Sequence, residues 1–326
     1  MVRQMGSASV STDEAIAEGQ RDIAIFEAAG DHAGLARAWR LLAQTYFNVG
    51  RLAEASNVAD EIVRHATAAG EPRLAARAAT TKANSLLFGS VPTTEAIRGC
   101  EELITQVGGD RRAEAILSGI LAVLHAMRGS FDQARELYSQ QRTILEGLGR
   151  NVAALTTSIN SARVELLAGD PEAAEREARR DFDALGALDE TYFRSTVAGM
   201  LARALYEGGR FAEAETVTED ARGLTADDDF ESQVLWRGVA ARLRARAGEA
   251  EEALELAASQ SQLAAETASP VFEADARLGL ADVLVLLGRR DEAEPPLREA
   301  LQLFELKGDL VSAGRIRLRL ESLATA

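Results

Sequence analysis

The chain has 326 residues, of which 47% are apolar and only 5% aromatic, and 51 acidic against 36 basic side chains give a net charge of −15. This acidity argues against sequence-independent binding to nucleic acid or to an anionic membrane surface. The apolar share comes largely from alanine and leucine, and no alternating β-branched run is present, which predicts an all-α fold.

The amino-terminal region divides into a tail and a first helix. We expect residues 1–11 to be a disordered or artificial tail and residues 12–326 to form a single repeat domain. The stretch Ser11-Thr-Asp-Glu14 matches a capping box, so a helix should begin there and end near Ala29, before Gly30.

Seven helix pairs are predicted after this first helix. In the first pair, helix A runs from Leu35 to Val49, Gly50 turns the chain, and helix B runs from Leu52 to about Ala69. A short turn of this kind makes the two helices antiparallel neighbours. A last helix, from Leu310 to about Leu323, should cap the end of the array.

Small residues recur with a period of about 40 residues. From Gly129 onward, turn glycines are spaced by 40, 40, 39 and 40 residues. Each helix A carries an alanine at one slot, namely Ala43, Ala83, Ala122, Ala162, Ala202, Ala241 and Ala281. Each helix B carries another, namely Ala55, Ala96, Ala134, Ala174, Ala214, Ala253 and Ala293. Small residues on facing helices allow close packing, so the pattern predicts an α-solenoid superhelix of about seven antiparallel pairs with a terminal helix at each end.

Two segments depart from this pattern. In the second pair, Gly89-Ser-Val-Pro92 replaces the usual turn and contains one inserted residue. Pro295 and Pro296 are expected in about the first turn of the last helix B, where a missing N–H group costs least.

The repeat resembles the tetratricopeptide repeat. In the first pair the resemblance rests on Leu42-Ala43, Tyr46, Gly50 and Ala55, and in the third pair on Leu121-Ala122, Gly129, Phe131, Ala134 and Tyr138. The period of about 40 exceeds the usual 34, and the terminal proline of the common form is absent, so both helices should be longer.

Three further stretches are similar to the carboxy-terminal arrays of large bacterial signalling proteins that carry nucleotide-cyclase or ATPase domains: residues 91–102, 124–129 and 232–237. This resemblance implies a regulatory role in the cytoplasm of a bacterium and a covalent or non-covalent link to a cyclase or ATPase module. No cyclase or ATPase segment is present in the chain, so those activities are not carried over.

Helix A should line the concave groove, and the slot after its alanine is therefore a candidate binding position. That slot holds Gln44, Asn84, Val123, Arg163, Arg203, Arg242 and Asp282. Three successive arginines suit carboxylate or phosphate groups of a partner. Alternatively each arginine pairs with a neighbouring Glu or Asp on a solvated face, an interpretation that is slightly favoured. We expect Arg40, Tyr206 and Arg246 to border the same groove.

Glycine occupies the position four residues before this slot in three repeats, as Gly119, Gly199 and Gly238. Glycine inside a helix costs about 1 kcal/mol relative to alanine, so an offset is needed. Contact between adjacent A helices is the favoured offset, and space for a bound chain is the alternative.

No catalytic or metal-binding constellation can be defended from spacing. The histidines His32, His65 and His125 are far apart in the sequence, and Cys100 lies on an apolar stripe, so core or surface roles are expected. We expect no cofactor, no metal and no membrane span.

The functional prediction is a non-catalytic scaffold or sensory domain that binds a protein or peptide segment, with acidic groups, in the concave groove. The alternative is a receptor whose superhelix changes shape when a metabolite fills that groove. An all-α enzyme is the third hypothesis.

Overall fold

The computed structural model describes residues 11–149 and 152–324. Of the tail expected at residues 1–11, residues 1–10 lie outside the described residues, and Ser11 is the N-cap of the first helix. Every regular element in these two ranges is helical, in seventeen α-helices and one short 3-10 helix. None of the described helices is both long and apolar enough to cross a membrane. The all-α prediction is confirmed.

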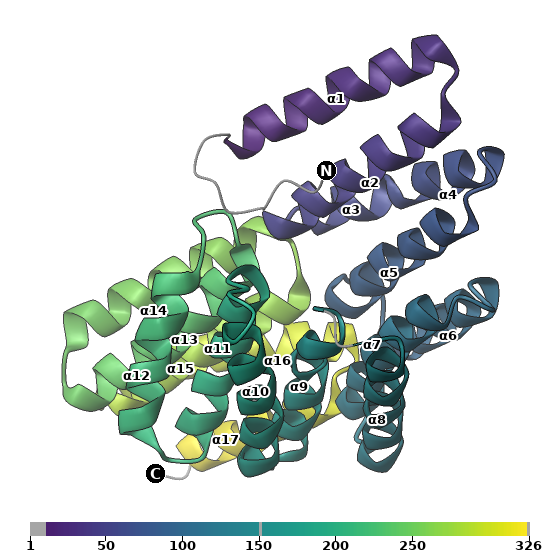
Figure 1. Cartoon of the computed structure of the whole chain (residues 1–326). Coiled ribbons are helices and arrows are strands. Elements are labelled where there is room, and N and C mark those ends of the chain that lie inside the picture. The colour runs from purple at the N-terminus through teal and green to yellow at the C-terminus, as the bar shows by residue number, and fades with distance from the viewer. Residues whose placement is uncertain (1–10, 150–151, 325–326) are drawn as a thin grey trace.

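The helices form seven antiparallel pairs between two single helices, α1 (Thr12–Ala29) and α17 (Leu310–Ala324), as the sequence predicts (Figure 1). The A helices are α2 (His32–Asn48), α5 (Pro72–Phe88), α7 (Arg111–Met127), α9 (Ser158–Ala168), α11 (Tyr192–Glu207), α13 (Phe230–Ala247) and α15 (Pro270–Leu286). The B helices are α3 (Leu52–Asn57) with α4 (Ala59–Ala68), α6 (Thr93–Gln106), α8 (Phe131–Gly147), α10 (Pro171–Gly186), α12 (Phe211–Leu224), α14 (Ala250–Glu266) and α16 (Arg290–Lys307).

The periodic alanines are the points where the helices of each pair meet. All seven helix-A alanines and all seven helix-B alanines are at most 1% exposed. A methyl group at these positions lets the two axes approach closely, and stacking each pair on the next buries a continuous core.

Local capping follows the sequence at several helix starts. In α1, the Glu14 backbone N–H donates to Ser11 Oγ (3.2 Å) and the Ser11 backbone N–H donates to Glu14 Oε2 (2.9 Å), which is the predicted capping box. Gly30 ends α1 in the left-handed region at φ 65°. Asp229 caps the start of α13 through the backbone N–H of Ser232.

Four helices depart from the expected boundaries. The first helix A begins at His32, with Asp31 as its N-cap, rather than at Leu35. The first helix B is interrupted at Val58, which separates α3 from α4. A 3-10 turn (Ala154–Thr156) precedes the shortened helix α9. Pro295 and Pro296 lie inside α16, in its second turn, because this helix already begins at Arg290. The earlier start places Ala293 in the helix, where its buried methyl group packs against the core of the last pair.

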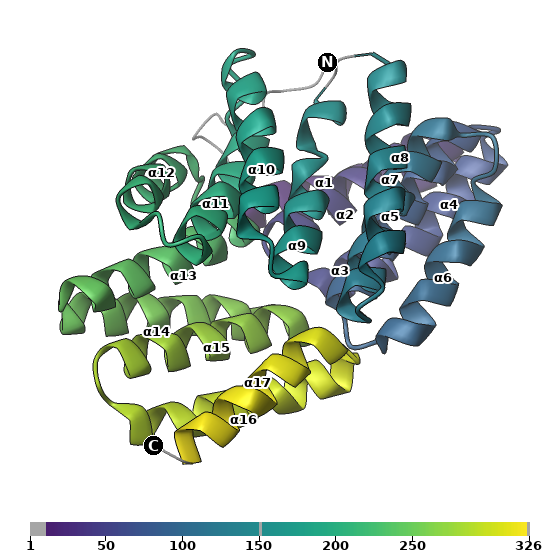
Figure 2. The same cartoon turned by 90° about the horizontal axis from the view of Figure 1, so that it is seen from below.

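The superhelix is wound so tightly that its later pairs contact its early ones. The turn of the first pair, at Gly50, lies against Phe230 at the start of α13, and the turn of the second pair lies against the start of α15. Figure 2 shows the end of α16 next to the turn between α5 and α6. The Phe88 ring stacks on the Phe272 ring with 4.8 Å between centroids. We call the contacts of residues 86–93 with residues 269–272 and with Lys307 the seam.

Candidate functional site

The inner surface of the superhelix is lined by the A helices, which pack on one another along the array. Its curvature is strong enough for ion pairs to skip a whole repeat. Arg163 of α9 pairs with Glu231 of α13, and its guanidinium lies 5.1 Å from the centre of the Phe88 ring of α5. Side chains of the second, fourth and sixth pairs therefore meet inside the array.

The other two arginines of the predicted ladder are also paired with carboxylates. Arg203 Nη1 lies 3.3 Å from Asp275 Oδ2. Arg242 Nη1 lies 3.3 Å from Glu207 Oε1 and 3.5 Å from Asp282 Oδ2. The charge of Asp275, ahead of the opposing effect of burial, raises the pKa of Arg203. In this conformation a ligand anion would have to compete with these internal carboxylates.

Tyr206 and Arg246 flank this ladder. The Arg242 guanidinium lies 5.0 Å from the centre of the Tyr206 ring, and burial raises the pKa of that phenol. Arg246 is exposed and lies over the Phe211 ring at 3.6 Å. Both side chains therefore pack on neighbouring groups of the array.

The first two repeats differ, because one half-buried arginine there has no carboxylate partner among the described residues. Arg40 of α2 is half-buried and has no hydrogen bond or ion pair with any described residue. Burial, and then the nearby charge of Arg77 on α5, lowers its pKa. Asn84 of α5 is half-buried, and Gln44 donates to Asn48 Oδ1 at 2.7 Å. Arg77 is exposed and likewise has no ion pair within the described ranges, so this part of the array holds two arginines without a carboxylate partner there.

The helix-A glycines make room for side chains of neighbouring helices. A methyl group on Gly199 would come within 2.8 Å of Leu235 Cβ on the next A helix, which confirms the expected contact. At Gly119 and Gly238 the neighbour is instead a glutamine of the paired helix B, Gln141 or Gln260, at 2.2 and 2.4 Å. Packing therefore explains all three glycines.

The seam contains a buried lysine whose position the repeat pattern did not reveal. The Lys307 side chain is 0% exposed, and its ammonium donates to three backbone carbonyl oxygens of the second pair. Burial lowers its pKa to about 8. The one sequence feature that pointed to this contact is the residue inserted in the turn at Gly89, because this turn supplies two of the three carbonyl groups that bind Lys307.

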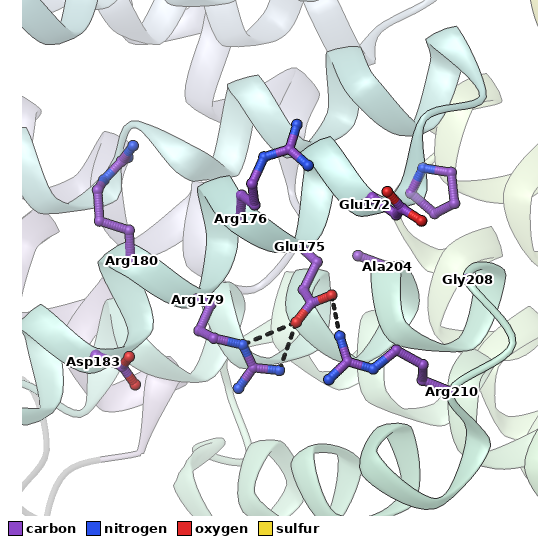
Figure 3. A pocket seen from close by; sticks show the side chains of 10 residues that line it. Glu172, Glu175, Arg176, Arg179, Arg180, Asp183, Ala204, Gly208 and Arg210 are labelled. Atoms are coloured by element: carbon purple, nitrogen blue, oxygen red, sulfur yellow. Dashed lines mark hydrogen bonds and ion pairs between the residues drawn. The ribbon is translucent and has the colours of Figure 1, made fainter.

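A cavity of about 570 Å³ lies on the outer side, between α10 and the turn from α11 to α12 (Figure 3). Glu175 links its two walls, accepting from Arg179 Nε at 3.0 Å and pairing with Arg210. Arg176 also lines the cavity and is exposed. The spacing of Arg176 and Arg179 along one helix face was the signal for this cluster in the sequence.

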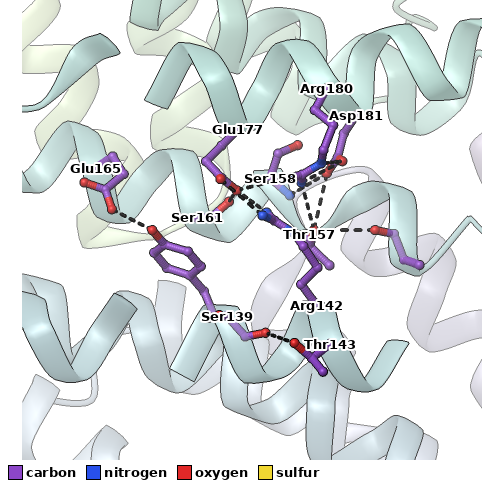
Figure 4. A network of polar contacts seen from close by, with 12 residues as sticks. Ser139, Arg142, Thr143, Thr157, Ser158, Ser161, Glu165, Glu177, Arg180 and Asp181 are labelled. Atoms are coloured by element: carbon purple, nitrogen blue, oxygen red, sulfur yellow. Dashed lines mark hydrogen bonds and ion pairs between the residues drawn. The ribbon is translucent and has the colours of Figure 1, made fainter. Parts of the chain in front are cut away.

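A polar network joins the third and fourth pairs (Figure 4). Arg142 of α8 pairs with Glu177 of α10, which also accepts from Ser161 Oγ at 2.7 Å. Glu165 of α9 is only 1% exposed and accepts from Tyr138 Oη at 2.8 Å. The Arg142–Glu177 and Tyr138–Glu165 contacts connect helices of different pairs, so they restrain this junction.

Buried histidine and cysteine side chains have structural surroundings. His125 is 8% exposed and burial lowers its pKa, while burial raises the pKa of the Cys100 thiol to about 12. Within the described ranges, no group of three or more histidine, cysteine or carboxylate side chains is arranged to hold a metal ion.

Comparison with known proteins agrees with this architecture. The tetratricopeptide repeat family model matches residues 36–61, 118–140, 155–180, 196–220 and 274–304. A search of curated protein sequences finds no match. A Rap protein solved in complex with Competence and Sporulation Factor is 15% identical, with a TM-score of 0.55 over 96% of this chain and 98% of that one. A second similar structure is a Signal Transduction ATPase with Numerous Domains protein from Pyrococcus horikoshii, which has a tetratricopeptide repeat sensor. It is 10% identical, with a TM-score of 0.52 over 98% of this chain and 54% of that one. These likenesses show a shared fold.

Proposed function

We propose that this chain, in which five segments match the tetratricopeptide repeat model, is a non-catalytic scaffold that binds a protein or peptide segment on its inner surface. The observation that carries the proposal is Arg40, a half-buried guanidinium that has no counter-ion in the described part of the chain and that feels the charge of a second arginine, Arg77. Partial burial removes water from the cation, so an anionic group of a partner would stabilise it more than solvent does.

The partner's chemistry follows from this site. A guanidinium binds a carboxylate through two parallel hydrogen bonds, and the amides of Gln44 and Asn84 suit a peptide backbone or a polar side chain. We therefore propose a segment with acidic side chains as the occupant. In the later repeats, Arg163, Arg203 and Arg242 would join this site only by exchanging their internal carboxylates for those of the partner.

Fluorescence anisotropy with fluorescein-labelled hexaglutamate tests the proposal, and labelled hexalysine serves as the charge-reversed probe. We expect hexaglutamate to bind and Arg40→Gln to weaken its binding about tenfold, as the loss of a charged hydrogen bond predicts. Arg98→Gln is the matched control, because Arg98 is exposed on helix α6, a B helix. Equal binding to wild type and Arg40→Gln would place the site elsewhere.

A second candidate function, a receptor for a small molecule, is supported by the outer cavity. Its volume of about 570 Å³ is in the usual range for small-ligand sites, and its arginines suit an anionic metabolite. A ligand that binds only the folded protein must raise its melting temperature, so a thermal-shift screen against anionic metabolites identifies such a compound. Loss of the shift in Arg176→Gln would assign it to this cavity.

We further propose that residues 12–326 act as one unit in the cytoplasm of a bacterium, with a regulatory role in a signalling system linked to a cyclase or ATPase module. The seam supports the single unit, since it joins the second pair to the seventh. The resemblance of residues 91–102 and 232–237 to signalling arrays motivates the regulatory role. A coding sequence for such a module next to this one in the parent genome would establish the link.

A further inference from the structure

The seam is centred on one fully enclosed ammonium group. Lys307 Nζ donates to the carbonyl oxygens of Leu86 at 2.6 Å, Gly89 at 2.9 Å and Val91 at 2.8 Å. The group has three N–H donors, so every donor has an acceptor. All three acceptors belong to the end of α5 and to the turn that follows it, in which the second pair carries its extra residue.

Further contacts at the same place are independent of the ammonium group. Thr93 Oγ1 donates to the backbone carbonyl oxygen of Lys307 at 2.8 Å. Ser269 Oγ donates to the carbonyl oxygen of Phe88 at 2.6 Å, and Phe88 stacks on Phe272. Hydrogen bonds thus cross the seam in both directions, and an aromatic pair lies beside them.

The stacking of the repeats does not require these contacts. Each pair of a solenoid is stabilised by its immediate neighbours, whereas the seam joins residues 221 and 216 positions apart. A buried ammonium is tolerated only while its acceptors surround it, and a partly separated seam would leave both the cation and the carbonyl groups unpaired. Partial opening is therefore unfavourable, and the seam is either closed or fully solvated.

The closed seam also restricts the inner surface. Phe88, which is 4% exposed, lies between Phe272 and the guanidinium of Arg163. Separating the seam would uncover this ring and release one contact of Arg163. The same separation would remove the hydrogen bonds that hold the second pair against the seventh, which would allow the superhelix to lengthen and its interior to widen.

We propose that the seam is a releasable latch, closed by Lys307, that holds the superhelix compact and withholds its inner surface from a partner segment. The withholding of the inner surface from a partner segment rests on the proposed function, whereas the latch itself does not. The chain contains only two lysines, Lys307 and Lys82. Lys82 pairs with Asp60 at a partly exposed site and provides a matched control.

Distance measurements between two spin labels test the latch without any ligand. Labels are attached to cysteines replacing Glu95 and Leu306, which are exposed on α6 and α16, in a Cys100→Ala background. We expect Lys307→Met to add a population with a longer distance, and Lys82→Met to match the parent. A folded Lys307→Met protein with the parental distance would overturn the proposal. Should this variant not fold, Thr93→Val removes one seam hydrogen bond at nearly constant volume and is judged in the same way.

Hexaglutamate binding then separates the latch from the proposed function. With the latch, Lys307→Met should bind hexaglutamate at least about threefold more tightly than Lys82→Met, because fewer molecules have to open first. A longer distance with unchanged affinity would refute the withholding of the inner surface and leave the proposed function intact. A longer distance with no binding by wild type or variants would support the latch and refute the acidic partner.

Discussion

His32 and His65 share a hydrogen bond of 2.8 Å between their Nδ1 atoms, which links the start of α2 to the end of α4. One nitrogen must donate and the other accept, so both rings cannot be protonated while this bond exists. His65 is 3% exposed, and burial, followed by the charges of Arg64 and His32, lowers its pKa. Protonation of His65 therefore opposes the packing of the first pair.

This arrangement predicts a loss of stability in acid. The pKa of His65 is lower in the folded chain than in the unfolded chain, where it is about 6.5, so the unfolded state binds more protons as the pH falls below that value. The charge of His32 is one cause of the lowered pKa of His65, and His32→Ala removes it. When the pH falls from about 7.5 to about 5.5, the unfolding free energy of His32→Ala should therefore decrease by about 0.5–1 kcal/mol less than that of wild type. Denaturant unfolding at both pH values measures this, and equal losses in the two proteins would refute it. The buried His125 is present in both proteins, so its own pH dependence affects their stability equally.

Lys307 predicts a pH dependence of the same sign as His65, at higher pH. Its folded pKa of about 8 lies below that of an unfolded lysine, so the unfolded state binds more protons from pH 8 upward and stability rises with pH. From about pH 8 to about pH 9.5, wild type should gain about 1–2 kcal/mol of unfolding free energy relative to Lys307→Met. Denaturant unfolding of both proteins provides the comparison. Parallel pH profiles would show that Lys307 does not titrate in this window.

The buried carboxylate Glu165 should depend on Arg135. Arg135 Nε and Nη2 donate to Glu165 oxygens at 3.0 and 2.7 Å. Removing the arginine leaves a nearly inaccessible carboxylate without its cation, so Arg135→Ala should cost about 3 kcal/mol of unfolding free energy. Arg135→Met combined with Glu165→Leu should recover most of that loss, as urea unfolding of the single and double variants would show. A double variant as unstable as Arg135→Ala would contradict this explanation.

Gly199 and Gly223 form a matched pair of helix glycines. A methyl group at Gly199 meets Leu235 Cβ at 2.8 Å, whereas at Gly223 nothing lies within 4 Å. Gly199→Ala should therefore destabilise the protein by about 1–3 kcal/mol, despite the better helix propensity of alanine. Gly223→Ala should stabilise it by up to about 1 kcal/mol. Thermal unfolding of the two variants decides the matter, and equal shifts would mean that Gly199 is not constrained by packing.

Most of the architecture could be predicted because one local pattern repeats. The alanine slots mark the same contact in all seven pairs, and a turn glycine with positive φ follows helix A in six of them, so the repetition defines the helices, their order and their facing sides. The departures arose where tertiary packing overrides local preference. The first helix B breaks at Val58, and α16 starts early enough to enclose both prolines.

The site was less predictable because its key contacts join distant repeats. The sequence shows which slots face inward but not which carboxylate meets each arginine, since Arg163 and Glu231 are 68 positions apart. The seam was still harder to predict, because Lys307 does not occupy any of the periodic positions. Arg40 shows the converse, because only a structure reveals that a charged side chain has no partner among the residues it describes.

Hydrogen–deuterium exchange of the wild-type protein with and without hexaglutamate tests the central claim most directly. If an acidic segment binds the inner surface of the first two repeats, protection should increase in α2 and α5 and remain unchanged in α10 and α12. Protection confined to α10 and the turn before α12, or no change anywhere at saturating peptide, would contradict the assignment of that surface.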